Sequence, residues 1–237
     1  MRLPSPLLRG RLVKRYKRFL ADIALDDGAA ITAHCANPGS MMGIAQEGAR
    51  VWVSEHHGAK RKLPYSWEIV EIGNTLIPIN TTNPNKIAAE AIEAGVIPEL
   101  AGYAEMRREV KYGEASRIDL LLQSGRRGAP CYVEVKNVHL SREAGLAEFP
   151  DSVTKRGAKH LVELSAMAAT GARAVMLFIV QRSDCARFRP AADLDPAYAQ
   201  ALTDAINAGV ETLCYDCEVT TSEVVLRKAL EIQLETL

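Results

Sequence analysis

The chain has 237 residues, enough for one large domain or two small ones, and its 48% hydrophobic content is that of an ordinary globular protein. Its 29 basic and 29 acidic residues give a formal net charge of zero. No apolar run is long enough for a transmembrane helix, and no apolar signal segment follows the basic N-terminus, so we expect no membrane association and no signal peptide. The five cysteines are an odd number, which favours reduced thiols and a cytoplasmic location.

The net charge of zero hides an uneven distribution along the chain. Basic residues alone precede Asp22, the first acidic residue, whereas acidic residues predominate after residue 190. A basic segment interleaved with aromatic side chains is typical of a nucleic-acid surface, and a solvated strand face is the alternative. We predict phosphate contacts from exposed cations and base stacking from a tyrosine, at Arg15, Tyr16, Lys17, Arg18, Lys60, Arg61 and Lys62.

Residues 9 to about 80 alternate between short apolar runs and turn signals, with almost no helical pattern. The clearest turn signals are 26–28 (DDG) and 37–40 (NPGS). Five or six short strands in about 70 residues predict a small closed β-barrel of the OB type, with Trp52 in its core. We expect its strands at 10–25 (as two strands or one bent strand), 30–35, 50–54, 60–72 and 75–79.

The polar segment 80–85 is rich in turn-forming residues. It marks the predicted boundary between a barrel domain, residues 1–82, and a mixed α/β domain, residues 83–237. In the second domain the expected helices are 86–95, 154–170 and 196–208, and the expected strands are 105–112, 117–122, 131–138, 174–180, 210–215 and 218–225.

The first six elements of the second domain follow the order helix, three strands, helix, strand, which is the core order of many metal-dependent nucleases.

Side chains that accept hydrogen bonds from backbone N–H groups are expected at the helix starts. We expect Asn83 or Asn85 to cap the first helix, and Asp151 or Ser152 to cap the second.

The most informative pattern lies in two of the expected strands. Asp119 lies in the apolar run 118–122, and Glu134 and Lys136 share one face of the run 131–138, because side chains alternate along a strand. If the strands pair, the two carboxylates converge on an oxygen-rich site that suits Mg²⁺ or Mn²⁺, and Lys136 could hold an attacking water or a phosphate oxygen. A buried structural ion pair is the alternative, and the spacing by itself leaves both interpretations open.

Further side chains are candidates for supporting this site. Arg117 shares a strand face with Asp119. Arg156 and His160 lie on one face of the expected helix 154–170 and would line the site and contact phosphate, and Glu163 continues this face, where a solvated position is the preferred interpretation. Gln181 follows an apolar strand and could orient a water, or it could be an exposed strand end.

Six segments carry a resemblance to a known family: 12–20 (LVKRYKRFL), 32–41 (TAHCANPGSM), 60–68 (KRKLPYSWE), 116–119 (SRID), 132–136 (YVEVK) and 149–160 (FPDSVTKRGAKH). With these segments the chain resembles the bacterial and archaeal sugar fermentation stimulation protein A family over nearly its whole length. The resemblance implies an N-terminal OB-fold-like barrel and a C-terminal domain like the PD-(D/E)XK nucleases. It also implies non-specific DNA binding and a proposed regulatory role in sugar (maltose) metabolism.

The same resemblance assigns the acidic strand residue of the nuclease-like pattern to Asp119 and its ExK triplet to 134–136. Such folds often add a glutamate from the first helix, for which we prefer Glu90 over Glu93. The proline that precedes the first acid in the pattern is absent, and Ile118 stands there.

Two functions of different classes remain. The first is an Mg²⁺- or Mn²⁺-dependent nuclease acting on DNA, with RNA as a further candidate substrate. The second is a DNA-binding regulator without catalysis, in which the acidic site is a structural ion pair. The sequence makes no prediction of oligomeric state.

Overall fold

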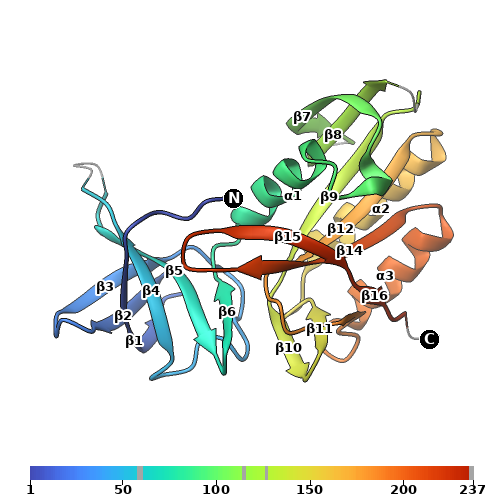
Figure 1. The fold of residues 1–237 in the computed structure, drawn as a ribbon. Coiled ribbons are helices and arrows are strands. Elements are labelled where there is room, and N and C mark those ends of the chain that lie inside the picture. Colours follow the sequence, from blue (N-terminus) through green and yellow to red (C-terminus); the bar gives the residue numbers. More distant parts are fainter. Residues whose placement is uncertain (58–60, 114–115, 126–127, 235–237) are drawn as a thin grey trace.

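The N-terminal part of the chain forms a closed barrel in the computed structural model, which describes residues 1–57, 61–113, 116–125 and 128–234 (Figure 1). The strands are arranged in the order β3-β2-β1-β4-β5-β6, and a parallel pairing of β3 with β5 closes the barrel. This confirms the OB-like barrel expected from the sequence. The strands are β1 (Leu7–Tyr16), β2 (Leu20–Leu25), β3 (Ala30–Cys35), β4 (Arg50–Glu55), β5 (Tyr65–Ile72) and β6 (Thr75–Pro78).

The predicted stretch 10–25 is two strands rather than one bent strand. Lys17 and Arg18 form the turn between them, with φ angles of 47° and 63°. The barrel core differs from the prediction in one residue, because the buried tryptophan is Trp67, which is 1% exposed. Trp52 instead packs against the core of the second domain, so its apolar ring helps to join the two domains.

The second domain is built on a six-stranded mixed sheet in the order β15-β14-β12-β9-β8-β7. Helix α1 packs on one face, and α2 and α3 pack on the other (Figure 1). The apolar strand β12 lies between β9 and β14 and pairs in parallel with both, as its continuous hydrophobic run predicts. The elements are α1 (Asn83–Glu93), the short 3₁₀ helix η1 (Pro98–Leu100), β7 (Tyr103–Tyr112), β8 (Ser116–Gly125), β9 (Cys131–Val138), α2 (Lys155–Ala169), β12 (Arg173–Val180), α3 (Pro196–Asn207), β14 (Glu211–Val219) and β15 (Val224–Ala229).

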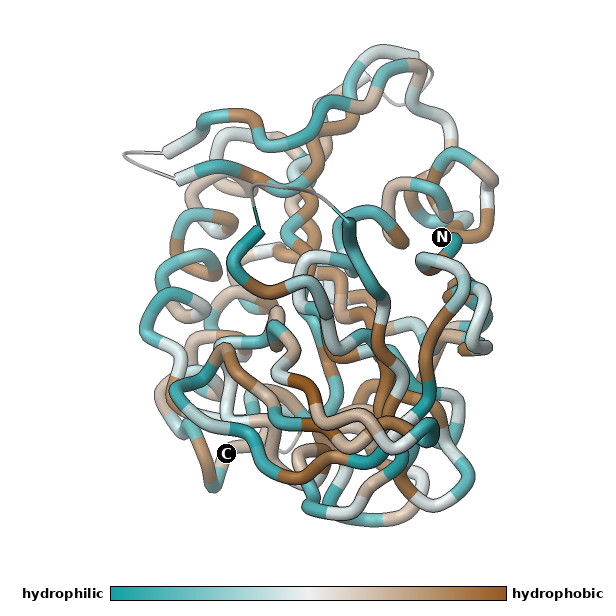
Figure 2. Tube along the Cα trace, turned by 90° about the vertical axis from the view of Figure 1, so that its left-hand side faces the viewer, coloured by the Kyte–Doolittle hydropathy of each residue, from teal (hydrophilic) through white to brown (hydrophobic). Residues whose placement is uncertain are grey.

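Hydrophobic segments gather in the central strands, and hydrophilic segments mark the loops around them (Figure 2). Buried side chains of the described residues form three clusters, one inside the barrel and one on each face of the central sheet. No helix in the described parts of the chain is both long and apolar enough to cross a membrane.

A second, four-stranded sheet was not expected from the sequence. Its strands run in the order β10-β11-β13-β16 and are short and rich in charge, which hides the apolar alternation of a strand. The predicted strand 218–225 is also wrong, because β14 continues to Val219 and the chain turns before β15. The strands of the second sheet are β10 (Leu140–Glu143), β11 (Leu146–Phe149), β13 (Arg187–Pro190) and β16 (Glu231–Ile232).

Both predicted helix caps are corrected by the structure. The N-cap position of α1 is Thr82, whose side chain makes no capping hydrogen bond to the described residues. Thr154 caps α2 by accepting a hydrogen bond from the Gly157 N–H at 3.1 Å. Asp151 instead faces the barrel, where its carboxylate accepts a hydrogen bond from the Met41 N–H at 2.9 Å.

The N-terminal residues belong to the second domain in space. The Leu3 N–H donates to the Ser222 carbonyl at 2.8 Å. The backbone of Arg2 forms an isolated antiparallel β-bridge with that of Glu223. Figure 1 shows the N-terminus beside α1. The chain therefore starts on the second domain, forms the barrel and returns.

Candidate metal centre and nucleic-acid interface

The predicted acidic residues meet where strands β8 and β9 separate. The two strands pair only over Leu120–Leu122 and Cys131–Val133. Below this ladder the Asp119 Oδ2 accepts a hydrogen bond from the Val135 N–H at 2.8 Å, so the carboxylate takes the place of a backbone carbonyl. Asn85 from the first turn of α1 donates to Oδ1 at 2.6 Å. Both oxygens of Asp119 are thus oriented by fixed donors.

Glu134 lies beside Asp119 and is 2% exposed. Its Oε1 accepts hydrogen bonds from Lys136 Nζ at 2.7 Å and from the Nδ1 of His160. Its buried Oε2 has no hydrogen-bond partner among the described residues. A buried carboxylate oxygen without a donor or cation costs free energy, so this atom has unused capacity to bind one.

The two carboxylates differ in their tendency to ionise. Burial, reinforced by the negative charge of Glu134, raises the pKa of Asp119 to about 6. Burial also opposes ionisation of Glu134, but the hydrogen bonds from His160 and Lys136 outweigh it, so the pKa of this group lies below its usual value. The repulsion between the two groups is a physical reason for a cation to bind between them.

Helix α2 adds two of the predicted supporting residues to this cluster. His160 Nδ1 lies 3.2 Å from Lys136 Nζ, and His160 Nε2 accepts a hydrogen bond from Arg156 Nε at 3.3 Å. Asp119, Glu134 and Lys136 are therefore joined to Arg156 through His160. Arg156 itself is exposed, with its guanidinium at the edge of the cluster.

Three other predicted supporting residues contact different parts of the protein. Glu90 pairs with the terminal amino group of Met1 at 2.8 Å. Arg117 is exposed and donates to the Glu109 carbonyl at 3.1 Å. Gln181 is fully buried and donates to Asn137 at 2.7 Å and to His139 at 3.1 Å, so it is no exposed strand end.

Sequence reasoning missed three residues around the cluster. Asn85, expected as a cap, holds Asp119. Glu163 is not on a solvated face, because its side chain is 11% exposed and accepts a hydrogen bond from Ser116 Oγ at 2.8 Å. The Tyr112 hydroxyl is buried without a hydrogen-bond partner in the described ranges, and burial with the nearby negative charges raises its pKa. Tyr112 ends β7, the strand that pairs with the strand of Asp119. This position was the one signal in the sequence that Tyr112 lies near the cluster.

The predicted nucleic-acid residues of the β1–β2 region divide into two groups. The Arg15 guanidinium is used internally, donating to the carbonyls of Asn37 and Gly39 at 2.9 Å each and of Ser40 at 3.3 Å, which corrects its assignment to phosphate. Lys17 and Arg18 are exposed at the tight turn.

The remaining predicted contacts lie elsewhere on the barrel. The Tyr16 hydroxyl donates to Asp22 at 3.1 Å, with Lys14 over its ring. Arg61 and Lys62 line a pocket between the barrel and α1. Lys60 lies outside the described residues.

The geometry defines a class of protein: an OB-like barrel joined to an α/β domain, with two carboxylates and a lysine close together where two strands separate. Residues 82–223 match the family described as "Sugar fermentation stimulation protein RE domain", and residues 13–79 match the "SfsA N-terminal OB domain". The chain belongs to the sugar fermentation stimulation protein (SfsA) family.

Curated relatives agree over the full length. The chain is 57% identical to the sugar fermentation stimulation protein homolog of Maricaulis maris, covering 99% of both chains. It is 57% identical to the homolog of Rhodospirillum centenum, covering 98% of this chain and 99% of the relative. A solved structure of Pyrococcus furiosus SfsA in complex with Ca²⁺ superposes with a TM-score of 0.87 at 28% identity, covering 98% of both chains.

Proposed function

We propose that this protein is a divalent-metal-dependent phosphodiesterase that acts on nucleic acid, with DNA as the first candidate substrate. The observation that carries the proposal is the buried Glu134 Oε2 without a hydrogen-bond partner among the described residues, next to the oriented carboxylate of Asp119. A buried carboxylate oxygen normally has a hydrogen-bond partner or a cation, and a divalent cation would supply one here.

The donor set fits Mg²⁺ or Mn²⁺. Asp119 and Glu134 would supply carboxylate oxygens, and hard cations of this kind complete their shell with water. The related Pyrococcus furiosus protein was solved with Ca²⁺, which prefers the same oxygen ligands. When bound, such a metal lowers the pKa of a coordinated water and stabilises negative charge on phosphate.

The remaining residues of the cluster have roles that follow from their contacts. Lys136, paired with Glu134, would position a water or a phosphate oxygen. His160 keeps Glu134 in place by donating from its Nδ1. The exposed Arg156, anchored at one nitrogen by His160, would bind a non-bridging phosphate oxygen.

DNA binding without sequence preference fits the distribution of charge on the barrel. Lys17, Arg18 and Lys62 are exposed cations, and phosphate contacts from such side chains carry no base information. The five cysteines are free and buried thiols, which supports a cytoplasmic location.

The test is incubation of the purified protein with single- and double-stranded DNA and RNA in Mg²⁺, Mn²⁺ or EDTA. We expect cleavage with metal only, reduced about a hundredfold or more in Asp119→Ala and Glu134→Ala, because each removes a charged group from the reacting centre. Asp193→Asn, an exposed carboxylate outside the cluster, is the matched control and should cleave normally. Absence of cleavage on every substrate, with DNA binding intact in both alanine variants, would contradict the nuclease.

A second candidate, a non-catalytic DNA-binding regulator of sugar (maltose) metabolism, is favoured by a different observation. Glu134 Oε1 is already paired with Lys136 and His160, and the described residues contain no group of three His, Cys, Asp or Glu side chains arranged to hold a metal. For this candidate, the alanine variants would bind DNA like the wild-type protein and no metal would be required.

A further inference from the structure

A pocket of about 610 Å³ lies between the barrel, the N-terminal segment and the first turn of α1. This volume falls within the range of about 300–1,000 Å³ typical of sites for a single small ligand. The acidic cluster does not line the pocket, yet the two share an element. Asn83 and Lys86 line the pocket, and Asn85 between them holds Asp119.

The wall of the pocket is basic. Arg2 and Lys62 are exposed and make no ion pair with the part of the chain that the structure describes. Lys86 is only loosely paired with Glu90, at 4.0 Å. Among the described lining residues the one carboxylate is Glu68, which is buried and accepts a hydrogen bond from Ser54 Oγ at 2.6 Å. The pocket therefore attracts an anion.

A flat aromatic pair lies at the edge of the pocket. His34 lines the pocket and stacks on Phe19, with ring centroids 6.3 Å apart and an interplanar angle of 11°. Phe19 is 44% exposed, which is unusual for so large an apolar ring. An exposed aromatic face, joined through His34 to a pocket with exposed cations, is an arrangement that suits unpaired bases and their phosphates.

We propose that this pocket binds a single strand of nucleic acid and leads it to the acidic cluster across the first turn of α1. Phosphates contact Arg2 and Lys62, and a base stacks on the Phe19–His34 pair. The proposal rests on the nucleic-acid substrate of the proposed function and specifies its form, a single strand rather than a duplex, because a stacked and paired base offers no free face to Phe19.

The test is fluorescence anisotropy with labelled oligothymidylate, oligouridylate and a duplex of equal length, all in EDTA so that cleavage plays no part. Arg2→Ala with Lys62→Ala should lower single-strand affinity and reduce the slope of log K against log salt by about 1.4, or about 0.7 for each phosphate contact. Phe19→Ala should weaken single-strand binding about fivefold to a hundredfold.

The controls match these changes elsewhere on the surface. Lys228→Ala removes an exposed lysine, and Val225→Ala removes a side chain that is also 44% exposed. Both should bind like the wild-type protein. A loss on either oligonucleotide supports the pocket, and the larger loss identifies the preferred strand.

Unchanged single-strand affinity in the pocket variants, or an equal loss on the duplex, would overturn the proposal. The outcome is separable from the cleavage assay. If the protein cleaves no substrate but these variants lose single-strand binding, the pocket proposal stands and the nuclease proposal fails. If the protein cleaves nucleic acid but these variants bind normally, the pocket proposal alone is overturned.

Discussion

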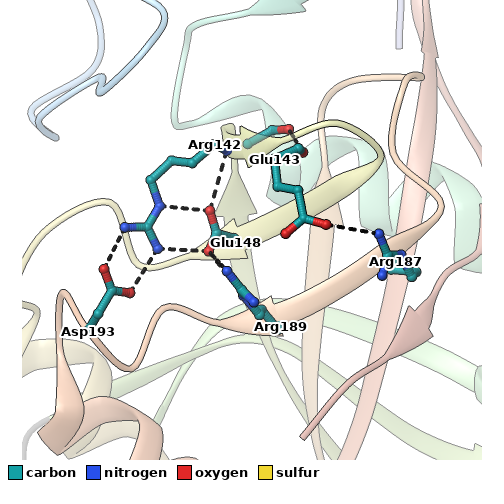
Figure 3. Close-up of polar contacts among 7 residues, drawn as sticks. Arg142, Glu143, Glu148, Arg187, Arg189 and Asp193 are labelled. Carbon is teal, nitrogen blue, oxygen red and sulfur yellow. Dashed lines mark hydrogen bonds and ion pairs between the residues drawn. The ribbon is translucent and has the colours of Figure 1, made fainter. Parts of the chain in front are cut away.

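Two buried glutamates in the second domain have different surroundings. Glu148 in β11 is 1% exposed, and both of its oxygens accept hydrogen bonds (Figure 3). Arg142 contacts both oxygens, at 2.7 Å and 2.8 Å, and Arg189 contacts Oε1 at 3.0 Å. Arg142 also pairs with Asp193, whose pKa it lowers to about 2 through its hydrogen bonds. Glu134 in β9 is as deeply buried, but among the described residues only its Oε1 has hydrogen-bond partners.

The difference separates a structural ion-pair network from a candidate site. The network around Glu148 holds the second sheet together and leaves no carboxylate oxygen of this residue for a ligand. The cluster around Glu134 has a carboxylate oxygen that no described residue pairs with, next to a second carboxylate whose repulsion the fold tolerates. Stability accounts for the first arrangement and does not account for the second.

The largest effect on stability is expected at the saturated glutamate. Glu148→Gln leaves two arginines without their buried partner and should lower the free energy of unfolding by about 4 kcal/mol. Glu134→Gln should cost about 1 kcal/mol, because the lost attraction to Lys136 and His160 is offset by relief of the repulsion with Asp119. Urea denaturation of both variants in EDTA measures the difference, and equal losses would remove the distinction between the two regions.

The next effect is the pH dependence that Asp119 confers. Its folded-state pKa of about 6 lies above the ordinary value, so between about pH 4 and pH 6 the native protein binds a proton that the unfolded chain has released. Its contribution to stability therefore falls as pH rises through this window, by about 3 kcal/mol in total.

The Asp119→Asn variant isolates this contribution. Glu134 and Glu148, whose pKa values are lowered, contribute with the opposite sign in both proteins. The wild-type protein should therefore lose stability relative to Asp119→Asn between pH 4 and pH 7 when unfolding is followed in EDTA. Parallel stability curves would show that the fold does not raise the pKa of Asp119.

The smallest effect is expected at Asn85. Asn85→Ala removes one hydrogen bond to the Asp119 carboxylate and should lower stability near neutral pH by about 1 kcal/mol. It should also raise the pKa of Asp119 further, because that hydrogen bond favours the ionised form. Carboxyl titration by NMR checks this direction, with Asn83→Ala on the same helix turn as the control.

The sequence predicts most of the fold because its elements have strong periodic or turn signals. Barrel strands, the apolar strand β12 and the helices all follow such patterns. The second sheet is not predicted because Arg142, Glu148 and Arg189 occupy strands of four residues, and β13, which pairs with β11, is distant from it in sequence. Trp52 and Trp67 lie in neighbouring strands with equal local signals, so only the tertiary structure assigns each to a core.

The candidate site, like the fold, is predicted by the sequence only in part. Spacing and strand alternation suffice to bring Asp119, Glu134 and Lys136 together as candidates. The choice of Glu90 from α1 does not follow from the helix alone, because the first turn of α1, with Asn85, faces Asp119, while Glu90 pairs with Met1. Arg15 lies in a basic segment that is typical of phosphate binding. Only the folded loop at 37–40 shows that its guanidinium donates to backbone carbonyls instead.

The central claim is that Asp119 and Glu134 together bind one divalent cation. Titration of Mn²⁺, with the free ion followed by electron paramagnetic resonance, tests it without requiring any activity. The wild-type protein and Asp193→Asn should take up one Mn²⁺ per chain, and Glu134→Gln should bind it at least about tenfold more weakly. Equal binding by Glu134→Gln, or no binding by the wild-type protein, would contradict the account.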